Sequence, residues 1–410
     1  MNQQEQLKAH VIECCVAGRM TVKEGAERLS LSERQVKRLK RRVKENGAES
    51  VLHRNCGRQP KHTLTPERRQ EVLEIKARPE YENVNFLHFQ ELLEREHKIK
   101  ISYSALRNLL LKHGHKSPKT HRKTKPKHPR RPRKECFGEM LQGDASRHQW
   151  FKNDDNYYTI HGLIDDATNT ITGLYMCENE CMEGYMQVMR QTISSYGVPK
   201  SLYLDGLSTF FGTKQPTIEE QLQGKTANTT QFGAMMGELG VGMIHARSSQ
   251  AKGRIEREWE TFQGRLETEF AIRGITTPEQ ANEFFPELMK NLNNKFCVLP
   301  AKKERKFMPK PKHINLDRLF AVKKTRIVDN SGCFTLDGIM FQTNIAGLKP
   351  QTKVQILISK KLGVKVVFED KLHKAIPILD DKKRAIKSSS IKDQIADCVR
   401  RHCLKDERAS

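Results

Sequence analysis

The chain has 410 residues, of which 36% are hydrophobic and 30% are charged, so it can form real cores beneath highly charged surfaces. At roughly 100 to 200 residues per domain, this length predicts about three or four folded units. The formal net charge of +24 calls for a polyanionic partner, and nucleic acid is the simplest one. We find no signal peptide and no run of about 18 apolar residues, so we expect a cytoplasmic, nucleoid-associated protein without a membrane partner.

Residues 1–50 have the pattern of a helix-turn-helix DNA-binding domain. Thr21 and Glu24 form a capping box before the second helix, and after a short turn Ser32 with Gln35 can cap the start of the third. The cations expected on the surface of this third helix are Arg34, Lys37, Arg38 and Arg41. We expect them to bind DNA in the major groove, although a solvated basic helix of a small bundle is an alternative.

Three segments follow this domain, between residues 51 and 135. Residues 51–63 form an extended basic linker in which Arg58 suits a narrow minor groove, or else a plain connection. Residues 64–115 have helical periodicity typical of a second helix-turn-helix-like domain. Residues 116–135 are basic and rich in proline, which predicts an irregular linker that neutralises phosphates or merely tethers the next domain.

From residue 136 to 298 the sequence predicts an α/β domain. Strands are predicted at 137–144, 157–165, 170–176, 201–204 and 241–245, with helices at 181–196, 228–239 and from about 253 onward. The first three strands are joined by short turns, and the later ones alternate with helices. This order predicts a mixed five-stranded sheet covered by helices.

Three carboxylates fall where this domain predicts strand ends and a helix start. Asp144 lies in or just after the first strand, Asp205 follows the fourth, and Glu256 opens the long helix. Three carboxylates that meet at one sheet edge can hold two divalent cations, which is the arrangement used for phosphodiester chemistry. We therefore predict these three residues as catalytic metal ligands, with Mg²⁺ as the ion and Mn²⁺ as a substitute.

Other acidic residues compete for these roles. Glu258 lies on the other flank of the same helix as Glu256, and periodicity alone does not choose between them. Asp165 and Asp166 precede a predicted turn, where aspartates usually cap backbone amides, so we interpret them as structural. His245 could act as a general base, but a packed or DNA-contacting histidine is equally consistent with its position.

Four segments carry a family resemblance: Gly143–Ser146, Gly162–Thr168, Tyr203–Gly206 and, most specifically, Ser249–Arg257. They resemble the ribonuclease-H-like integrase core of retroviral integrases and insertion-sequence transposases, and over residues 1–380 the order is similar to transposases of the ISNCY type. The resemblance implies a triad of Asp144, Asp205 and Glu256 and favours Glu256 over Glu258. It also implies hydrolysis at the 3′ ends of a mobile element, followed by attack of the new hydroxyl on target DNA.

The polar residues around the predicted glutamate are candidates for DNA contacts. They are Gln250, Lys252, Arg254 and Arg257. Positive charge here would help a site with three carboxylates to accept a phosphate, although ordinary surface charges are the alternative.

The remaining segments predict a small C-terminal unit. Residues 299–322 form a basic connector, and short strands with tight turns in 323–380 predict a small closed β-barrel. Its position resembles the SH3-like or Mu-type β domain of related transposases. Residues 381–410 form a charged tail whose function the sequence does not indicate.

Together these observations predict a transposase that binds double-stranded DNA, both element ends and target, as a homo-oligomer that holds two ends together. One alternative is a transposase-derived DNA-binding regulator without catalysis. The other is a structure-selective nuclease of ribonuclease-H-like fold, for which two DNA-recognition units ahead of the core are unexpected.

Overall fold

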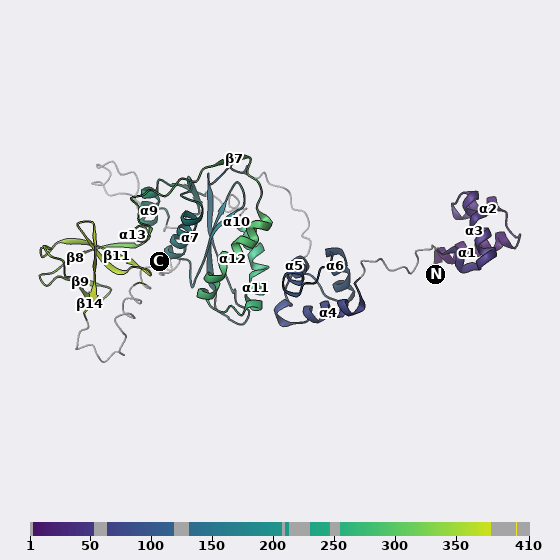
Figure 1. The fold of residues 1–410 in the computed structure, drawn as a ribbon, viewed down its shortest axis with the longest axis horizontal. Coiled ribbons are helices and arrows are strands. Elements are labelled where there is room, and N and C mark those ends of the chain that lie inside the picture. Colours follow the sequence, from purple (N-terminus) through teal and green to yellow (C-terminus); the bar gives the residue numbers. More distant parts are fainter. Residues whose placement is uncertain are drawn as a thin grey trace. The chain divides into compact units, whose positions relative to one another are not determined.

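The computed structural model describes residues 3–52, 64–118, 131–206, 210–212, 230–246, 255–378 and 399. The chain divides into two compact units, Met1–Leu73 and Glu74–Ser410. Figure 1 labels their helices and strands. Across the described residues, none of the helices combines the length and apolarity that crossing a membrane requires.

The first unit contains the predicted helix-turn-helix fold. Its helices are α1 (Gln3–Val16), α2 (Val22–Leu29) and α3 (Glu33–Asn46), followed by the 3₁₀ turn η1 (Ala48–Val51). Both predicted capping boxes are present, at Thr21 with Glu24 and at Ser32 with Gln35. The core consists of side chains from all three helices, including Ile12, Cys15, Ala26, Val36, Leu39 and Val43. Because the apolar stripe of α3 is buried there, its charged positions face solvent.

A second group of helices precedes the sheet. Helix α4 (Pro66–Lys76) crosses the boundary between the units, and the turn η2 (Pro79–Tyr81), α5 (Phe86–His97) and α6 (Tyr103–Lys112) follow. Asn85 and Ser102 accept backbone hydrogen bonds at the starts of α5 and α6. Phe89, Leu92 and Leu106 are fully buried between these helices. We call residues 74–115 the helical unit below.

The predicted mixed five-stranded sheet is confirmed. Its strands are β2 (Leu141–His148), β3 (Tyr158–Asp165), β4 (Ile171–Cys177), β5 (Ser201–Leu204) and β6 (Gly242–His245), in the order β4-β3-β2-β5-β6. The first three pair antiparallel, whereas β5 runs parallel to β2 and β6 parallel to β5. Because β2 and β5 are parallel, the residues that follow β5 lie beside the middle of β2.

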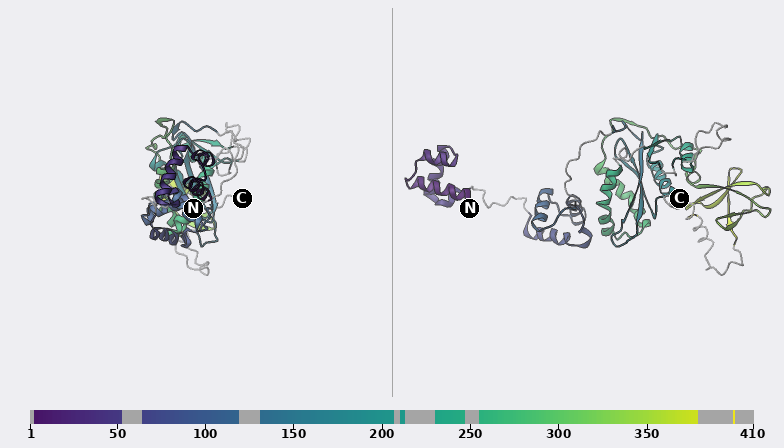
Figure 2. Two further views of the ribbon diagram at one scale, coloured as in Figure 1. Left: turned by 90° about the vertical axis from the view of Figure 1, so that its right-hand side faces the viewer. Right: turned by 180° about the vertical axis from the view of Figure 1, so that it is seen from behind.

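Helices cover both faces of this sheet (Figure 2). Helices α7 (Met182–Ser195) and α9 (Gln231–Leu239) pack with Leu163, Leu202 and Leu204 on one face. Helices α10 (Ile255–Gln263), α11 (Leu266–Arg273) and α12 (Pro278–Phe296) pack with Ile160, Ile164 and Leu174 on the other. The sheet is thus the middle layer of three.

Two predicted elements differ from the structure. The first long strand begins at residue 141 rather than 137, because Gly138 adopts a φ of +85° and turns the chain after the short strand β1 (Cys136–Phe137). Phe137 packs instead on Phe307, with the ring centroids 4.9 Å apart. The predicted long helix is two helices, since Arg265 leaves helical geometry between α10 and α11.

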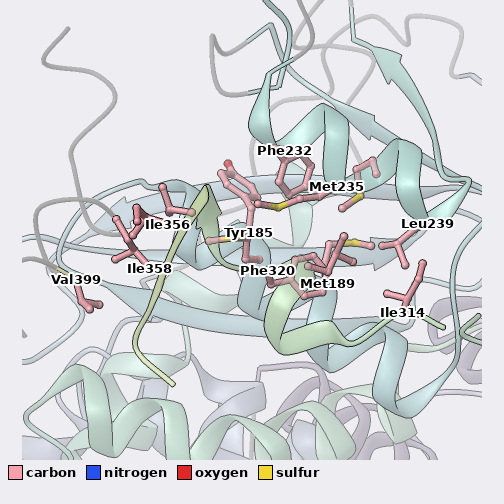
Figure 3. Packing of buried hydrophobic residues seen from close by; sticks show 14 of the residues in the cluster. Tyr185, Met189, Phe232, Met235, Leu239, Ile314, Phe320, Ile356, Ile358 and Val399 are labelled. Carbon is pink, nitrogen blue, oxygen red and sulfur yellow. The ribbon is translucent and has the colours of Figure 1, made fainter. Parts of the chain in front are cut away.

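The C-terminal part consists of antiparallel sheets, and a closed barrel is not shown. After β7 (Lys302–Arg305) and α13 (Leu316–Leu319), one sheet contains β8 (Val322–Ile327), β11 (Lys353–Ser359), β12 (Gly363–Phe368) and β13 (Lys371–Lys374). The other contains β9 (Cys333–Leu336), β10 (Ile339–Gln342) and β14 (Ile376–Pro377). Side chains such as Phe320 and Ile356 join the same apolar cluster as Tyr185 and Met189 of α7 (Figure 3).

Candidate active site

Strand pairing brings the first two predicted carboxylates to neighbouring positions. Strands β2 and β5 pair in parallel with Leu141 opposite Leu202 and Gln142 opposite Tyr203. Continued by two residues, this register places Asp144 opposite Asp205. Neighbouring strands lie about 4.8 Å apart, so the two backbones are adjacent at this edge. Asp144 lies in the middle of β2, and Asp205 directly follows β5.

Helix α10 runs along β2, and its side chains contact the strand at regular intervals. Gln142 Oε1 accepts a hydrogen bond from the backbone of Ile255 at 3.4 Å. Trp259 Nε1 donates to Asp144 Oδ2 at 3.0 Å, and Gln263 Nε2 donates to Ser146 Oγ at 3.2 Å. Four helical residues rise about 6 Å and two strand residues about 6.7 Å, so every fourth residue of α10 meets every second residue of β2. This match holds the start of α10 against Gln142 and Trp259 against Asp144.

Two glycines in the predicted motifs make this close packing possible. A Cβ on Gly162, which pairs with Asp144, would lie 2.8 Å from the Trp259 ring. A Cβ on Gly143 would lie 2.4 Å from Leu204 of β5. Any larger side chain would push the indole or the neighbouring strand away from Asp144.

The two candidate glutamates of α10 lie on different flanks. At about 100° per residue, Glu256 is about 60° around the helix from Trp259, and Glu258 is about 100° away on the opposite side. Glu256 is exposed. Burial raises the pKa of the Glu258 carboxyl. Burial also raises the pKa of the Cys297 thiol, and the Glu258 charge adds to that rise. Glu258 is thus half-buried, on the flank of α10 opposite Glu256.

Asp165 and Asp166 bind the protein itself, as the structural interpretation predicts. Asp165 accepts hydrogen bonds from the backbones of Gly138 at 2.8 Å and Thr168 at 2.9 Å. Asp166 accepts from the Lys134 backbone at 2.8 Å and pairs with Arg131. Both carboxyls are almost wholly buried, and they tie the end of β3 to the residues on either side of β1.

A buried tyrosine lies close to both predicted aspartates. Tyr185 donates to Glu180 Oε1 at 2.8 Å. Burial raises the pKa of the Tyr185 hydroxyl, and the charges of Glu180, Asp144 and Asp205 raise it further.

A buried histidine fixes the position of this tyrosine. Burial lowers the pKa of His161 to about 4, so the ring is neutral, and its Nε2 accepts from the Cys181 backbone at 3.1 Å. The rings of His161 and Tyr185 meet edge to face, with centroids 4.8 Å apart. Sequence reasoning did not identify Tyr185 or Trp259 as parts of the site. For Trp259 the signal was present, because a buried indole N–H needs a hydrogen-bond acceptor.

The uncommitted His245 lies beside Asp205. A Cβ on Gly206, the next residue, would lie 2.6 Å from His245 Nε2. The imidazole also packs on Phe211, with centroids 5.0 Å apart. His245 is therefore an exposed residue whose ring contacts Phe211 next to the predicted site.

The predicted metal ligands are all oxygen donors, the type that Mg²⁺ and Mn²⁺ prefer. In the described part of the chain, no three histidine, cysteine or acidic side chains are spaced to hold one metal ion. Asp144 and Asp205 meet by register, while Glu256 follows directly after residues 247–254, which lie outside the described residues. Convergence of all three carboxylates therefore stays a prediction.

The predicted DNA-binding residues fall into two groups. Those on α3 are exposed: Arg34, Lys37, Arg38 and Arg41. Their ion pairs are weak surface contacts, such as Lys37 with Glu33 at 3.7 Å, so they remain available to phosphates. Arg257 on α10 is also exposed. The others lie outside the described residues: Arg58, Gln250, Lys252 and Arg254.

Comparisons with known proteins agree with these features. A family model described as a helix-turn-helix domain matches residues 7–61. The transposase for insertion sequence IS1202 of Streptococcus pneumoniae is 32% identical over 357 residues, covering 80% of this chain and 75% of that protein. A putative transposase, y4bF, of Sinorhizobium fredii is 30% identical over 319 residues, covering 78% of this chain and 67% of that protein.

Structural likenesses to viral integrases are weak. The HTLV-2 integrase catalytic core domain in complex with magnesium has a TM-score of 0.30 and 15% identity, covering 42% of this chain and 95% of that one. A simian T-cell lymphotropic virus intasome in complex with PP2A regulatory subunit B56 gamma has the same TM-score and identity, covering 75% of this chain and 96% of that one.

Proposed function

The chain belongs to the insertion-sequence transposases, and we propose that it cuts and rejoins DNA with Asp144, Asp205 and Glu256. It would cleave the 3′ ends of its element by hydrolysis and join the new hydroxyls to target DNA by transesterification. The observation that carries this proposal is the register of β2 and β5, which makes Asp144 and Asp205 neighbours, with α10 laid along β2.

The three carboxylates would hold two Mg²⁺ ions, or Mn²⁺ in their place. Bound there, the metals would activate the attacking oxygen and stabilise the leaving oxygen of a phosphodiester. The indole of Trp259 orients the Asp144 carboxylate through its hydrogen bond. Gln142 fixes the start of α10 and therefore the backbone of the residue before Glu256.

DNA would be bound by separate parts of the chain. The cations of α3 would bind the element ends, and Arg58 an adjacent minor groove. Gln250, Lys252, Arg254 and Arg257 would position the scissile phosphate against the charge of the three carboxylates. Because two ends must be held together for joining, the active form would be a homo-oligomer.

The test is Mg²⁺-dependent joining of labelled DNA from the flanks of the gene to a plasmid. Glu256→Gln should abolish joining while leaving end-binding intact, because it removes a charged metal ligand but no DNA contact. Glu258→Gln is the matched control on the opposite flank of α10 and should join normally. Loss of joining in Glu258→Gln alone would reassign the third ligand. A wild type that binds the ends but never nicks or joins them, with either metal, would favour a DNA-binding regulator. Cleavage of branched DNA without any joining would favour a structure-selective nuclease.

A further inference from the structure

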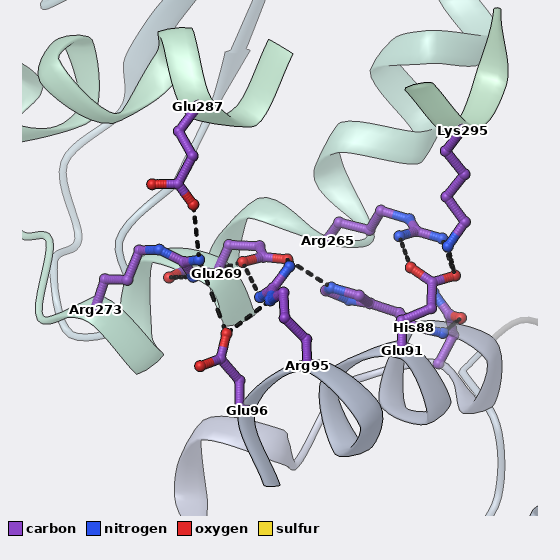
Figure 4. Close-up of polar contacts among 10 residues, drawn as sticks. His88, Glu91, Arg95, Glu96, Arg265, Glu269, Arg273, Glu287 and Lys295 are labelled. Atoms are coloured by element: carbon purple, nitrogen blue, oxygen red, sulfur yellow. Dashed lines mark hydrogen bonds and ion pairs between the residues drawn. The ribbon is translucent and has the colours of Figure 1, made fainter. Parts of the chain in front are cut away.

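Helix α5 is buried on two sides. Phe89, Leu92 and Leu93 pack into the helical unit and are fully buried. On its other side His88, Glu91 and Arg95 meet α11 and α12 of the catalytic core (Figure 4).

Glu269 of α11 is the centre of this contact. It is 5% exposed and accepts from His88 Nε2 at 3.0 Å. Arg95 donates to both of its carboxylate oxygens, at 3.1 and 2.7 Å, and Arg273 donates at 2.7 Å. Three basic groups thus surround one buried carboxylate. Burial opposes ionisation, but the hydrogen bonds and charges of His88 and Arg95 lower the pKa of Glu269 to about 2.

A second ion pair lies one turn away on α5. Arg265, 9% exposed, donates to both oxygens of Glu91 at 2.6 and 3.1 Å. Lys295 of α12 pairs with the same carboxylate. We call the contacts of His88, Glu91 and Arg95 with Arg265, Glu269, Arg273 and Lys295 the joint.

The ion pairs of the joint specify one relative position of the two helices more than they add net stability. Buried ion pairs add little net stability, because the cost of desolvating both charges offsets their attraction. Two bidentate arginine–carboxylate pairs, however, accept only one relative position of the partners. Displacing α5 by one helical turn would leave Arg265 without Glu91 and Glu269 with Arg273 of its own helix as its remaining ion-pair partner.

The joint leads directly to the predicted active site. Arg265 precedes α11 and comes two residues after Gln263, which ends α10 and bonds to Ser146 of β2. One turn earlier, Trp259 bonds to Asp144. The position of α5 is thus connected to Asp144 through consecutive packed residues.

The joint also leaves the second helix of the pair free. In a helix-turn-helix the second helix enters the major groove, while the first crosses over it. Here the first helix, α5, is held by the core. The second, α6, exposes Tyr103 at 43% and Leu111 at 44%, together with Arg107 and Lys112.

We propose that the helical unit is a fixed measuring element: α6 binds the element end, and the joint sets the distance from that DNA to Asp144. This inference rests on the proposed function and deepens it. His88, Glu91, Arg95, Arg265 and Glu269 are then positioning residues that determine which phosphate is cut.

The test uses the full chain and charge exchange across the joint. Glu91→Arg and Arg265→Glu are made on a Lys295→Gln background, which is their reference, so that Lys295 does not oppose the new arginine. Each then places like charges together, whereas the double substitution restores an opposite pair. Glu283→Arg, an exposed acid on α12, is the matched control. Each protein is footprinted on labelled end DNA, and its nick is mapped to the nucleotide. If Arg265→Glu fails to fold, Glu91→Gln supplies the milder perturbation.

Wild type and Glu283→Arg should nick at one phosphate. Each single substitution should bind the ends within about threefold of wild type but spread the nick over neighbouring phosphates, with a rate at least tenfold lower. The double substitution should restore one position, which a merely structural role would not require. Nicks at the wild-type position in both single variants would overturn the inference. So would a double variant whose nicks are spread over as many phosphates as those of the single variants.

A wild type that never nicks refutes the proposed function but leaves the footprint as a separate readout. The footprints of the helical unit and the core should then keep a fixed spacing in wild type and lose it in the single variants. Unchanged spacing in those variants would overturn the measuring element on its own.

Discussion

Replacing Gly162 by alanine should separate Trp259 from Asp144. The new Cβ would lie 2.8 Å from the indole, which must retreat by about 0.6 Å to reach an ordinary 3.4 Å contact. The same movement would lengthen the 3.0 Å hydrogen bond to Asp144 to about 3.6 Å, beyond hydrogen-bonding range. Overpacking and loss of this bond to a carboxylate should together cost about 2 to 4 kcal/mol of core stability. Misplacing a catalytic group by less than 1 Å should lower joining by up to about 100-fold.

Urea unfolding followed by tryptophan fluorescence, alongside the joining assay, measures both effects. The control is Gly237→Ala in α9, where a Cβ meets nothing within 4 Å and should stabilise the helix by about 0.5 to 1 kcal/mol. If Gly162→Ala unfolds at the wild-type urea concentration and joins at the wild-type rate, the close packing of Trp259 against β3 does not position Asp144.

Three further predictions concern charged groups. The unfolded chain protonates His161 near pH 6.5 and the folded chain only near pH 4, so the free energy of unfolding should fall by up to about 3 kcal/mol as the pH falls between these values, and no further below. His161→Gln should flatten this dependence of stability on pH, and an unchanged dependence would contradict the prediction. Glu269→Gln should lower the free energy of unfolding by about 3 kcal/mol at pH 7. Because the folded pKa of Glu269 is about 2, below the ordinary 4.5, the difference in stability from wild type should shrink as the pH is lowered from 4.5 towards 2. A constant difference would count against the buried pair. Arg38→Ala should reduce the slope of log affinity against log salt for end DNA by about 0.9, and an unchanged slope in binding titrations would remove Arg38 from the interface.

Local signals predicted much of the fold. The capping boxes at Thr21 and Ser32 fix helix starts through contacts three residues apart, and both are formed. Apolar and β-prone runs located the five strands, and the positions of Asp144 and Asp205 relative to them followed. Such features depend on neighbours in the chain, which is why they can be read from the sequence.

Long-range pairing could not be read in the same way. Glu269 lay within a predicted long helix like any surface glutamate, and nothing near it in the chain indicates His88 and Arg95 as partners. The closed barrel was inferred from strand number and turns, but which strands pair depends on contacts across loops. Gly138 moved the first strand because a positive φ breaks a run that is otherwise prone to form a strand.

The central claim is that Asp144, Asp205 and Glu256 hold the same metal ions. Fe²⁺ bound in place of Mg²⁺ on the protein–DNA complex, with ascorbate and peroxide, cleaves polypeptide next to the ion. The account predicts cuts within a few residues of all three positions, suppressed by excess Mg²⁺ and lost in Asp205→Asn. Cuts near only one of them, or in another part of the chain, would contradict it.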